Sequence, residues 1–298
     1  MSALISAAAF GAIGAAVLAI AAVGFTLQFG VTNYVNFAYG ELVTFGAYVG
    51  WSVNQQFHVP VAVALLVGSA GTALLAFVVQ RFIFTPFLRR RAQLLFLLIV
   101  TFIMSLILND AIAAVWSTDF HEMPPLVSDA VHSFGPVIVS TDQLLFVAIA
   151  VVTMAAVHVL LRYTKLGRYM RAMSDDGSLA AVCGINTKMV ADVTWLISGF
   201  VAGLAGVILA IQTHTFAPDL GDVYLFLIVS AVILGGIGRA YGAVVGAVVV
   251  GLATQLVVLI PGLPTTLSPV AVFALLIAIM VFRPQGLMGA VPRPVVER

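Results

Sequence analysis

Charged residues are scarce in this sequence, and their scarcity excludes an ordinary soluble domain. Only 8% of the 298 residues are charged and 62% are hydrophobic, whereas roughly 25% of a typical soluble chain is charged. The apolar runs are continuous rather than alternating, which disfavours a transmembrane β-barrel. Their many Gly and Ala residues favour helices that pack closely in lipid. The composition therefore predicts an all-α polytopic membrane protein.

Cysteine and lysine are equally scarce, and each absence removes a class of site. The single cysteine, Cys183, allows neither a disulfide within the chain nor a four-ligand Cys/His metal site. The two lysines, Lys165 and Lys188, both follow Thr, so the phosphate-binding Gly-x-x-x-x-Gly-Lys-Ser/Thr loop is absent. The five histidines show no pair at metal-binding spacing. We expect no metal or cofactor in this chain and no nucleic-acid partner.

Nine apolar segments are long enough to cross the hydrocarbon core, which takes roughly 20 helical residues. The second and seventh segments are short and interrupted by Gly, so roughly eight to ten spans remain compatible with the pattern. No soluble domain or linker separates them, which predicts one membrane domain over 1–298. The nine segments cover approximately 3–27, 35–52, 59–81, 93–115, 142–162, 189–211, 222–237, 241–260 and 268–283.

The basic residues predict the orientation, because Lys and Arg in short loops are retained on the cytoplasmic side. With nine spans all 13 Lys and Arg fall on one face, which predicts an external N-terminus and a cytoplasmic C-terminus in a bacterial inner membrane. No basic residue precedes Arg81, so we expect the first segment to be a retained span rather than a cleaved signal. The longest external loop is about 116–141. The opposite face collects acidic residues: Asp119, Glu122, Asp129, Asp219 and Asp222.

The apolar interiors contain almost no ionisable residues, although ion-coupled carriers usually hold such residues at membrane depth. Only Glu41 is expected to lie within a span. The chain is therefore expected to be a passive pore or to receive its energy from another subunit. An enzyme is not favoured, because no His/Asp/Glu cluster or Ser–His arrangement converges within the spans.

The largest cytoplasmic segment, about 167–188, is the candidate docking surface for such a subunit. Its pattern predicts a short surface helix over roughly 175–183, although an ordinary amphipathic connector would show the same spacing. Ser174 or Asp175 would cap the start of this helix, and Gly184 and Asn186 would end it. One side of the helix would expose Leu179, Val182 and Cys183.

Two Gly-bounded bends interrupt the apolar segments. Irregular backbone at membrane depth is tolerated mainly where it lines protein or a water-filled cavity, and discontinuous spans often mark a transport path. Ala38-Tyr39-Gly40 recurs as Ala240-Tyr241-Gly242, which is weakly indicative of an internal duplication. The candidate path or gate residues at the two bends are Asn33, Asn36, Tyr39, Gly40 and Glu41, and Gly235, Gly236 and Gly238.

Glu41 and a pair of glycines each allow two interpretations. Glu41 is expected at the cytoplasmic start of the second span, where its carboxylate could cap the helix N-terminus or serve as a gate. Gly199 and Gly203 have the four-residue spacing of closely packed membrane helices. They could pack within the chain or form an interface with a second subunit.

Four stretches of the chain match one known family in residues and in order. They are Gly167-Arg168 with Arg171-Ala172, Asp176 and Gly184-Ile185-Asn186; Asn36-Phe37-Ala38-Tyr39-Gly40-Glu41 with Phe45-Gly46-Ala47-Tyr48; Leu234-Gly235-Gly236-Ile237-Gly238 with Tyr241-Gly242-Ala243; and Arg283-Pro284-Gln285-Gly286-Leu287-Met288-Gly289. Together they resemble the LivH-type permease subunits of branched-chain amino-acid ABC transporters. Tyr39 departs from the family's usual His.

This resemblance implies a fold like that of type II ABC importer permeases and a role as half of a translocation path for branched-chain or other amino acids. It implies four kinds of partner: a second, LivM-like permease, two LivG/LivF-like ATP-binding subunits that hold ATP and Mg, an external solute-binding protein, and the bilayer. The alternatives are an amide or urea permease of the same family, or a self-sufficient channel. The residues implied to couple to the ATP-binding subunits are Arg168, Arg171, Asp175, Asp176, Leu179, Gly184, Ile185 and Asn186.

Overall fold

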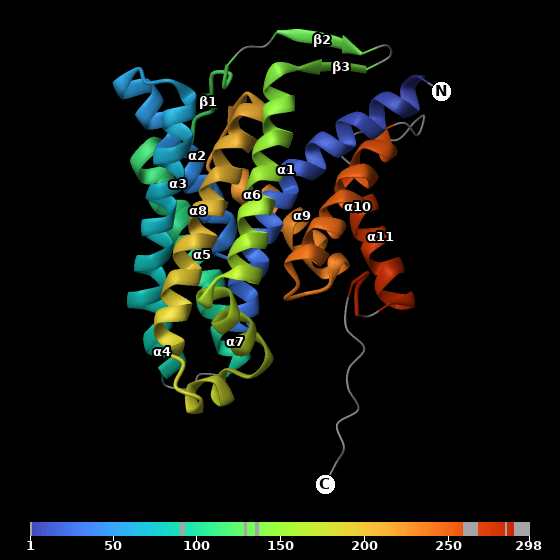
Figure 1. The fold of residues 1–298 in the computed structure, drawn as a ribbon. Helices are drawn as coiled ribbons and strands as arrows, with labels where there is room; N and C mark the ends of the chain where they lie inside the picture. Colours follow the sequence, from blue (N-terminus) through green and yellow to red (C-terminus); the bar gives the residue numbers. More distant parts are fainter. Residues whose placement is uncertain are drawn as a thin grey trace.

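The computed structural model describes residues 2–89, 93–127, 130–134, 137–258, 268–283 and 285–288. Each of the nine predicted segments coincides with a helix, which confirms the all-α class (Figure 1). Six helical stretches of the described chain are long and apolar enough to cross a membrane. The nine helices are α1 (Ser2–Thr32), α2 (Tyr39–Phe57), α3 (Val61–Val78), α5 (Leu94–Trp116), α6 (Thr141–Tyr163), α8 (Thr187–Thr213), α9 (Leu220–Gly235), α10 (Ala240–Val258) and α11 (Ser268–Phe282).

The remaining elements lie at the two ends of the bundle. Helix α3 continues through a π-helical turn, η1 (Val79–Phe84), into α4 (Thr85–Arg89). Helix α7 (Lys165–Val182) also lies at this lower end (Figure 1). The short strands lie at the upper end: β1 (His121–Glu122) pairs antiparallel with β4 (Thr215–Phe216), and β2 (Val131–Phe134) with β3 (Val137–Ser140).

The centre of the bundle is formed by α1 and α8. Helix α1 packs along α10 and α8, and α8 is also covered by α2 and α3. Close approach depends on small residues. Gly203 faces Ser69 and Thr72 of α3, and Gly199 faces Thr72 and neighbouring Ala residues. These glycines therefore pack helices within the chain, and the alternative of an interface with a second subunit is wrong for them.

Helices α5 and α6 lie at the periphery and expose apolar side chains. Leu95 and Phe102 of α5 and Val151 and Val152 of α6 are all more than half exposed. An exposed apolar surface of this extent marks a protein or membrane contact. In a bundle with six apolar spans, it is the surface expected to face lipid or another membrane subunit.

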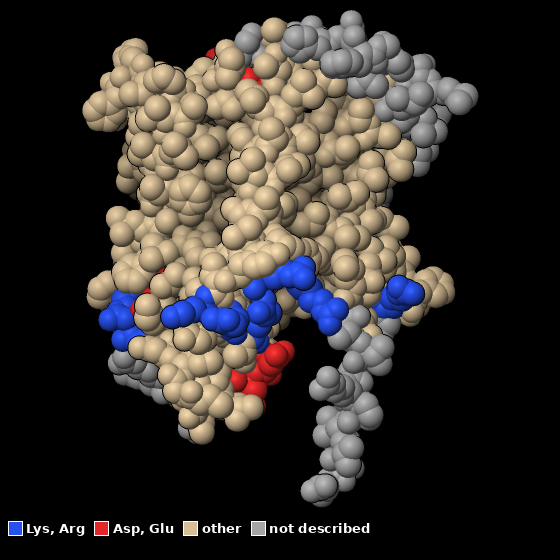
Figure 2. Space-filling model, viewed as in Figure 1, with Lys and Arg blue, Asp and Glu red and all other residues tan. Residues whose placement is uncertain are grey.

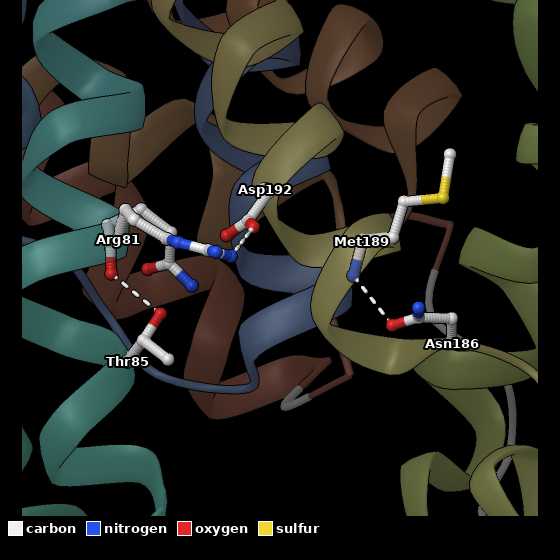
Figure 3. Close-up of polar contacts among 6 residues, drawn as sticks. Arg81, Thr85, Asn186, Met189 and Asp192 are labelled. Carbon is white, nitrogen blue, oxygen red and sulfur yellow. Dashed lines mark hydrogen bonds and ion pairs between the residues drawn. The ribbon is translucent and has the colours of Figure 1, made fainter.

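Basic side chains form a band across the lower end of the molecule (Figure 2). This confirms the predicted one-sided distribution for the described side chains; those of Arg89, Arg90, Arg91, Arg293 and Arg298 lie outside them. Arg81 of η1 forms an ion pair of 2.8 Å with Asp192 of α8, which ties the third predicted segment to the central helix (Figure 3). The described basic side chains are Arg81, Arg162, Lys165, Arg168, Arg171, Lys188, Arg239 and Arg283.

The substitution Gly206→Ala should destabilise the bundle, because a Cβ at Gly206 would overlap the backbone carbonyl of Val43 in α2. Overpacking of this kind costs about 1–3 kcal/mol. The control is Gly14→Ala in α1, where a Cβ meets nothing within 4 Å. Thermal unfolding of both purified variants in one detergent should show a lower midpoint only for Gly206→Ala, and equal midpoints would contradict the close-packing argument.

Candidate functional site

The candidate docking segment is a helix broken into two parts. Thr164 caps the start of α7, since its Oγ1 accepts a hydrogen bond of 3.0 Å from the Gly167 amide. The first part then packs Met170 and Met173 into the core. At Asp176 the backbone leaves the helical region, with φ −157° and ψ 104°, and a second short helical stretch follows. The segment therefore has a core-facing part and an outward part.

Asp176 begins the second part, and the predicted cap at Ser174 or Asp175 is wrong. The Asp176 Oδ1 accepts hydrogen bonds from the Ser178 hydroxyl at 2.6 Å, the Ser178 amide at 2.9 Å and the Leu179 amide at 3.0 Å. These bonds, that of the Ser178 side chain first, lower the pKa of the Asp176 carboxyl. The sequence shows three consecutive capping residues, Ser174 to Asp176, and only the break in backbone direction selects the third.

The outward part of α7 ends at Gly184, as the sequence predicted. Gly184 has a left-handed conformation with φ 85°, which glycine adopts at little cost. The Gly184 amide donates to the Ala181 carbonyl at 3.0 Å, and the Ile185 amide to the Ala180 carbonyl at 3.1 Å. This is the pattern of a Schellman motif.

Asn186 is not a terminator of this helix but the cap of α8. Its Oδ1 accepts a hydrogen bond from the Met189 amide at 3.1 Å (Figure 3). Ile185, just before it, packs partly buried against the core. The chain therefore turns directly from the outward helix into the central helix of the bundle.

The side chains of the segment divide into anchoring and outward groups. The Arg171 guanidinium donates to the carbonyl of Leu161 near the end of α6, and so anchors α7 to its neighbour. Leu179 and Val182 are 60% and 86% exposed, and Cys183 is exposed as predicted. The remaining predicted coupling residues, Arg168 and Asp175, are also exposed.

The first predicted bend is a reversal of the chain between α1 and α2. Asn33 has a positive φ of 57° and its amide donates to the Phe29 carbonyl at 2.7 Å. Asn36 is buried, and its Oδ1 accepts from the Ala38 amide at 3.1 Å. Tyr39 is fully buried, with its hydroxyl donating to the Ala21 carbonyl at 2.8 Å. Side chains thus supply the hydrogen bonds that an irregular backbone loses inside a bilayer.

Glu41 lies near the middle of the bundle, so its predicted place at the cytoplasmic start of a span is wrong. Its Oε1 accepts from the Ser105 hydroxyl at 3.5 Å. Ser105 is eleven residues after Leu94 and eleven before Trp116, the two ends of α5. At a rise of 1.5 Å per residue it is about 16 Å from each end. Helix α2 therefore starts at mid-depth rather than at a surface.

The start of α9 meets the start of α2 at this depth. The Gly221 amide donates to Thr44 Oγ1 at 2.8 Å, and the backbones of Gly40 and Gly221 are so close that a Cβ on either would overlap the other. The two helices run in opposite directions from this point. Helix α2 rises toward Glu122, whose carbonyl accepts from Trp51 at 3.1 Å, while α9 descends toward the basic end.

Each of these two helices carries a carboxyl in its first turn, Glu41 in α2 and Asp222 in α9. The Asp222 carboxyl and the Asn109 side chain lie close to Glu41. Glu41 has no exposed surface and its Oε2 accepts no hydrogen bond, whereas Asp222 is exposed in the isolated chain. The predicted place of Asp222 on the external face is therefore wrong, and the sequence pattern did not indicate Ser105 or Asn109. One sequence pattern could have indicated that Glu41 and Asp222 are related: a Gly followed by an acidic residue occurs at Gly40-Glu41 and again at Gly221-Asp222.

The second predicted bend lies elsewhere, at the basic end. Gly236 and Gly238 have φ of 111° and 79°. The carbonyl of Gly235 accepts from the Met288 amide at 3.1 Å, and the Arg239 guanidinium donates to the Met288 carbonyl. The two predicted groups of path residues are therefore separated in the structure. Tyr39 and Tyr241, which the repeated Ala-Tyr-Gly pattern had paired, are not equivalent, because Tyr39 is buried and Tyr241 is half exposed.

Comparisons with a family model and with individual known proteins point to the same family. Residues 7–280 match the family model of the branched-chain amino acid transport system permease component. The high-affinity branched-chain amino acid transport system permease protein LivH of Escherichia coli K12 is 28% identical over 293 residues, covering 94% of this chain and 92% of the relative. BraD of Pseudomonas aeruginosa, which has the same description, is 27% identical over 296 residues, covering 94% and 93%.

Another relative, which matches over a shorter stretch, has a name that gives a different substrate. The ribose import permease protein RbsC of Escherichia coli K12 is 29% identical over 247 residues, covering 78% of this chain and 72% of the relative. No solved structure matches the chain significantly.

The substitution Asp176→Ala should loosen the outward helix, because the Ser178 and Leu179 amides would lose their acceptor. Hydrogen exchange at these two amides should become faster, with no change for Asp175→Ala.

The stabilisation of the outward helix by the Asp176 cap in the wild-type chain should also depend on pH. Because the folded-state pKa is lowered, the stabilisation is present above the ordinary aspartate pKa of about 3.9 and is lost as pH falls through the lowered value. Protection that is independent of Asp176 would contradict the assignment.

Proposed function

Because the chain belongs to the permease component family of the branched-chain amino acid transport system, we propose that it forms half of the translocation path of an ATP-driven amino-acid importer. The observation that carries this proposal is the exposed Asp222 beside Glu41 at mid-depth. A carboxylate is costly against lipid and usually faces a protein neighbour or a water-filled cavity. The face that includes Asp222 therefore calls for a second permease subunit, with the path between the two.

The exposed carboxyl of Asp222 supports an amino acid as the substrate. The relatives LivH and BraD are described as branched-chain amino acid permeases, and RbsC as a ribose permease. An amino acid carries an ammonium group that the exposed Asp222 carboxylate could bind by a charge-assisted hydrogen bond, whereas ribose carries no charge. Leucine, isoleucine and valine are the leading substrates of the proposal, and amides or urea the alternative within the family.

The energy is proposed to come from partners. With no phosphate-binding loop in the sequence, ATP and Mg would bind two LivG/LivF-like subunits, while a LivM-like permease completes the path and a solute-binding protein delivers substrate. The multi-pass chain would lie in the inner membrane with the basic end in the cytoplasm, the N-terminus outside and the C-terminus inside.

The outward part of α7 is the proposed contact for the ATP-binding subunits. Leu179 and Val182 are apolar and exposed, and the helix that presents them is capped at both ends by Asp176 and Gly184. Helix α7 packs against α1, α6 and α8. A displacement of the outward part would therefore reach the central helices through these contacts.

Uptake of radiolabelled leucine into liposomes is the test of this function. The chain reconstituted with its second permease, ATP-binding and solute-binding partners should accumulate leucine only with ATP. The chain alone should not transport, because it lacks an energy source and half of the path. Uptake by the purified chain alone, without ATP, would favour the self-sufficient channel and overturn the proposal.

The substitution Asp222→Asn should reduce ATP-dependent leucine uptake by the assembled transporter about tenfold or more, because a hydrogen bond between the exposed carboxylate and the substrate ammonium would contribute about 1.5–3 kcal/mol. Subunit assembly, followed by copurification, should be retained. The control Glu122→Gln changes an exposed carboxyl at the upper end and should transport normally. If Asp222→Asn both assembles and transports like the wild type, the charge of Asp222 is not needed.

A further inference from the structure

A cavity of about 640 Å³ opens at the basic end between the end of α1, the α6–α7 junction and the turn before α10. Its cationic wall comes from three separate elements, with Arg162 from α6, Arg171 from α7 and Arg239 from the α9–α10 turn. Its other lining is mainly apolar, including Leu27 and Val31 of α1. The cavity therefore joins a positively charged rim to an apolar floor.

The charge of this rim is not neutralised within the described residues. No Asp or Glu lines the cavity, and the ion pair found in the described chain joins Arg81 and Asp192 instead. Arg171 and Arg239 each use one nitrogen to bond a backbone carbonyl, which leaves further N–H donors, since a guanidinium has five. The Asp176 carboxyl, two residues after the lining residue Ser174, accepts hydrogen bonds from Ser178 and Leu179.

The cavity lies at the level expected for lipid headgroups. Leu161 and Arg162, which line it, belong to the last turn of α6, and Tyr241 belongs to the first turn of α10. Tyr163 and Tyr241 are 70% and 50% exposed there. Exposed tyrosines at helix ends are typical of the membrane–water interface. The band of basic side chains in Figure 2 lies at the same end.

We propose that this cavity binds the phosphate headgroup of an anionic phospholipid. Guanidinium groups bind phosphate oxygens through paired, charge-assisted hydrogen bonds, and basic pockets between helix ends on this side suit such headgroups. The apolar floor along α1 would accommodate the start of an acyl chain. A free phosphate shares the headgroup chemistry but makes no use of that floor. A bound lipid would join α6 and α7 to the α9–α10 turn, and so brace the docking segment.

Native mass spectrometry and thermal unfolding of the delipidated, purified chain test the proposal. Phosphatidylglycerol should bind and raise the unfolding midpoint more than phosphatidylcholine does. The double variant Arg162→Gln, Arg239→Gln should bind phosphatidylglycerol about tenfold or more weakly, since each basic side chain near an anionic surface contributes appreciably. The control Arg283→Gln removes an exposed arginine that does not line the cavity, and should bind like the wild type.

Three outcomes would overturn the proposal. Equal effects of the two lipids would show that charge is not recognised. Equal weakening by Arg283→Gln would show a diffuse response of the whole basic band. Full reproduction of the midpoint shift by inorganic phosphate alone would assign the cavity to a free anion. Arg239→Lys keeps the charge and separates loss of binding from loss of folding, because it should retain part of the lipid effect and unfold like the wild type without lipid.

Discussion

The meeting of two helix starts inside the hydrocarbon is the constraint on which the rest of the structure depends. Backbone groups that leave regular helix at that depth must find partners within the protein. Here the partners are side chains: Asn36 for the Ala38 amide and Thr44 for the Gly221 amide. The polar residues of this bend thus have a structural reason to lie in an otherwise apolar chain, before any role in transport is considered.

Close backbone contact is the second requirement of this arrangement. Two chains can start helices side by side at mid-depth only where Gly40 and Gly221 leave room for each other. The same use of small residues recurs where α8 crosses α2 and α3. Because lipid provides no hydrophobic drive for helices to associate, such contacts supply packing that larger side chains would prevent. The close packing of α8 at the centre of the bundle follows from these crossings.

The two ends of the bundle differ in chemistry because the docking segment and the basic band share one end. Arg171 participates in both, since it anchors α7 to the Leu161 carbonyl and lines the cationic cavity. The outward helix is therefore held on its inner side by polar and apolar contacts, while Leu179 and Val182 stay available on its outer side. An arrangement of this kind can carry a displacement from a docked partner to the central helices.

Local patterns in the sequence determined the nine apolar segments, the one-sided distribution of basic residues and the helix end at Gly184, because hydropathy, loop charge and left-handed backbone are properties of a few neighbouring residues. Only the tertiary structure decided that Glu41 lies at mid-depth, that Asp222 is its neighbour, that Asp176 is the cap and that three arginines share one cavity. Glu41 and Asp222 are brought together by the reversal at Asn33 and by the crossing of helices far apart in the chain. No local pattern contains the geometry of those crossings, because it arises from how small residues on different helices fit together.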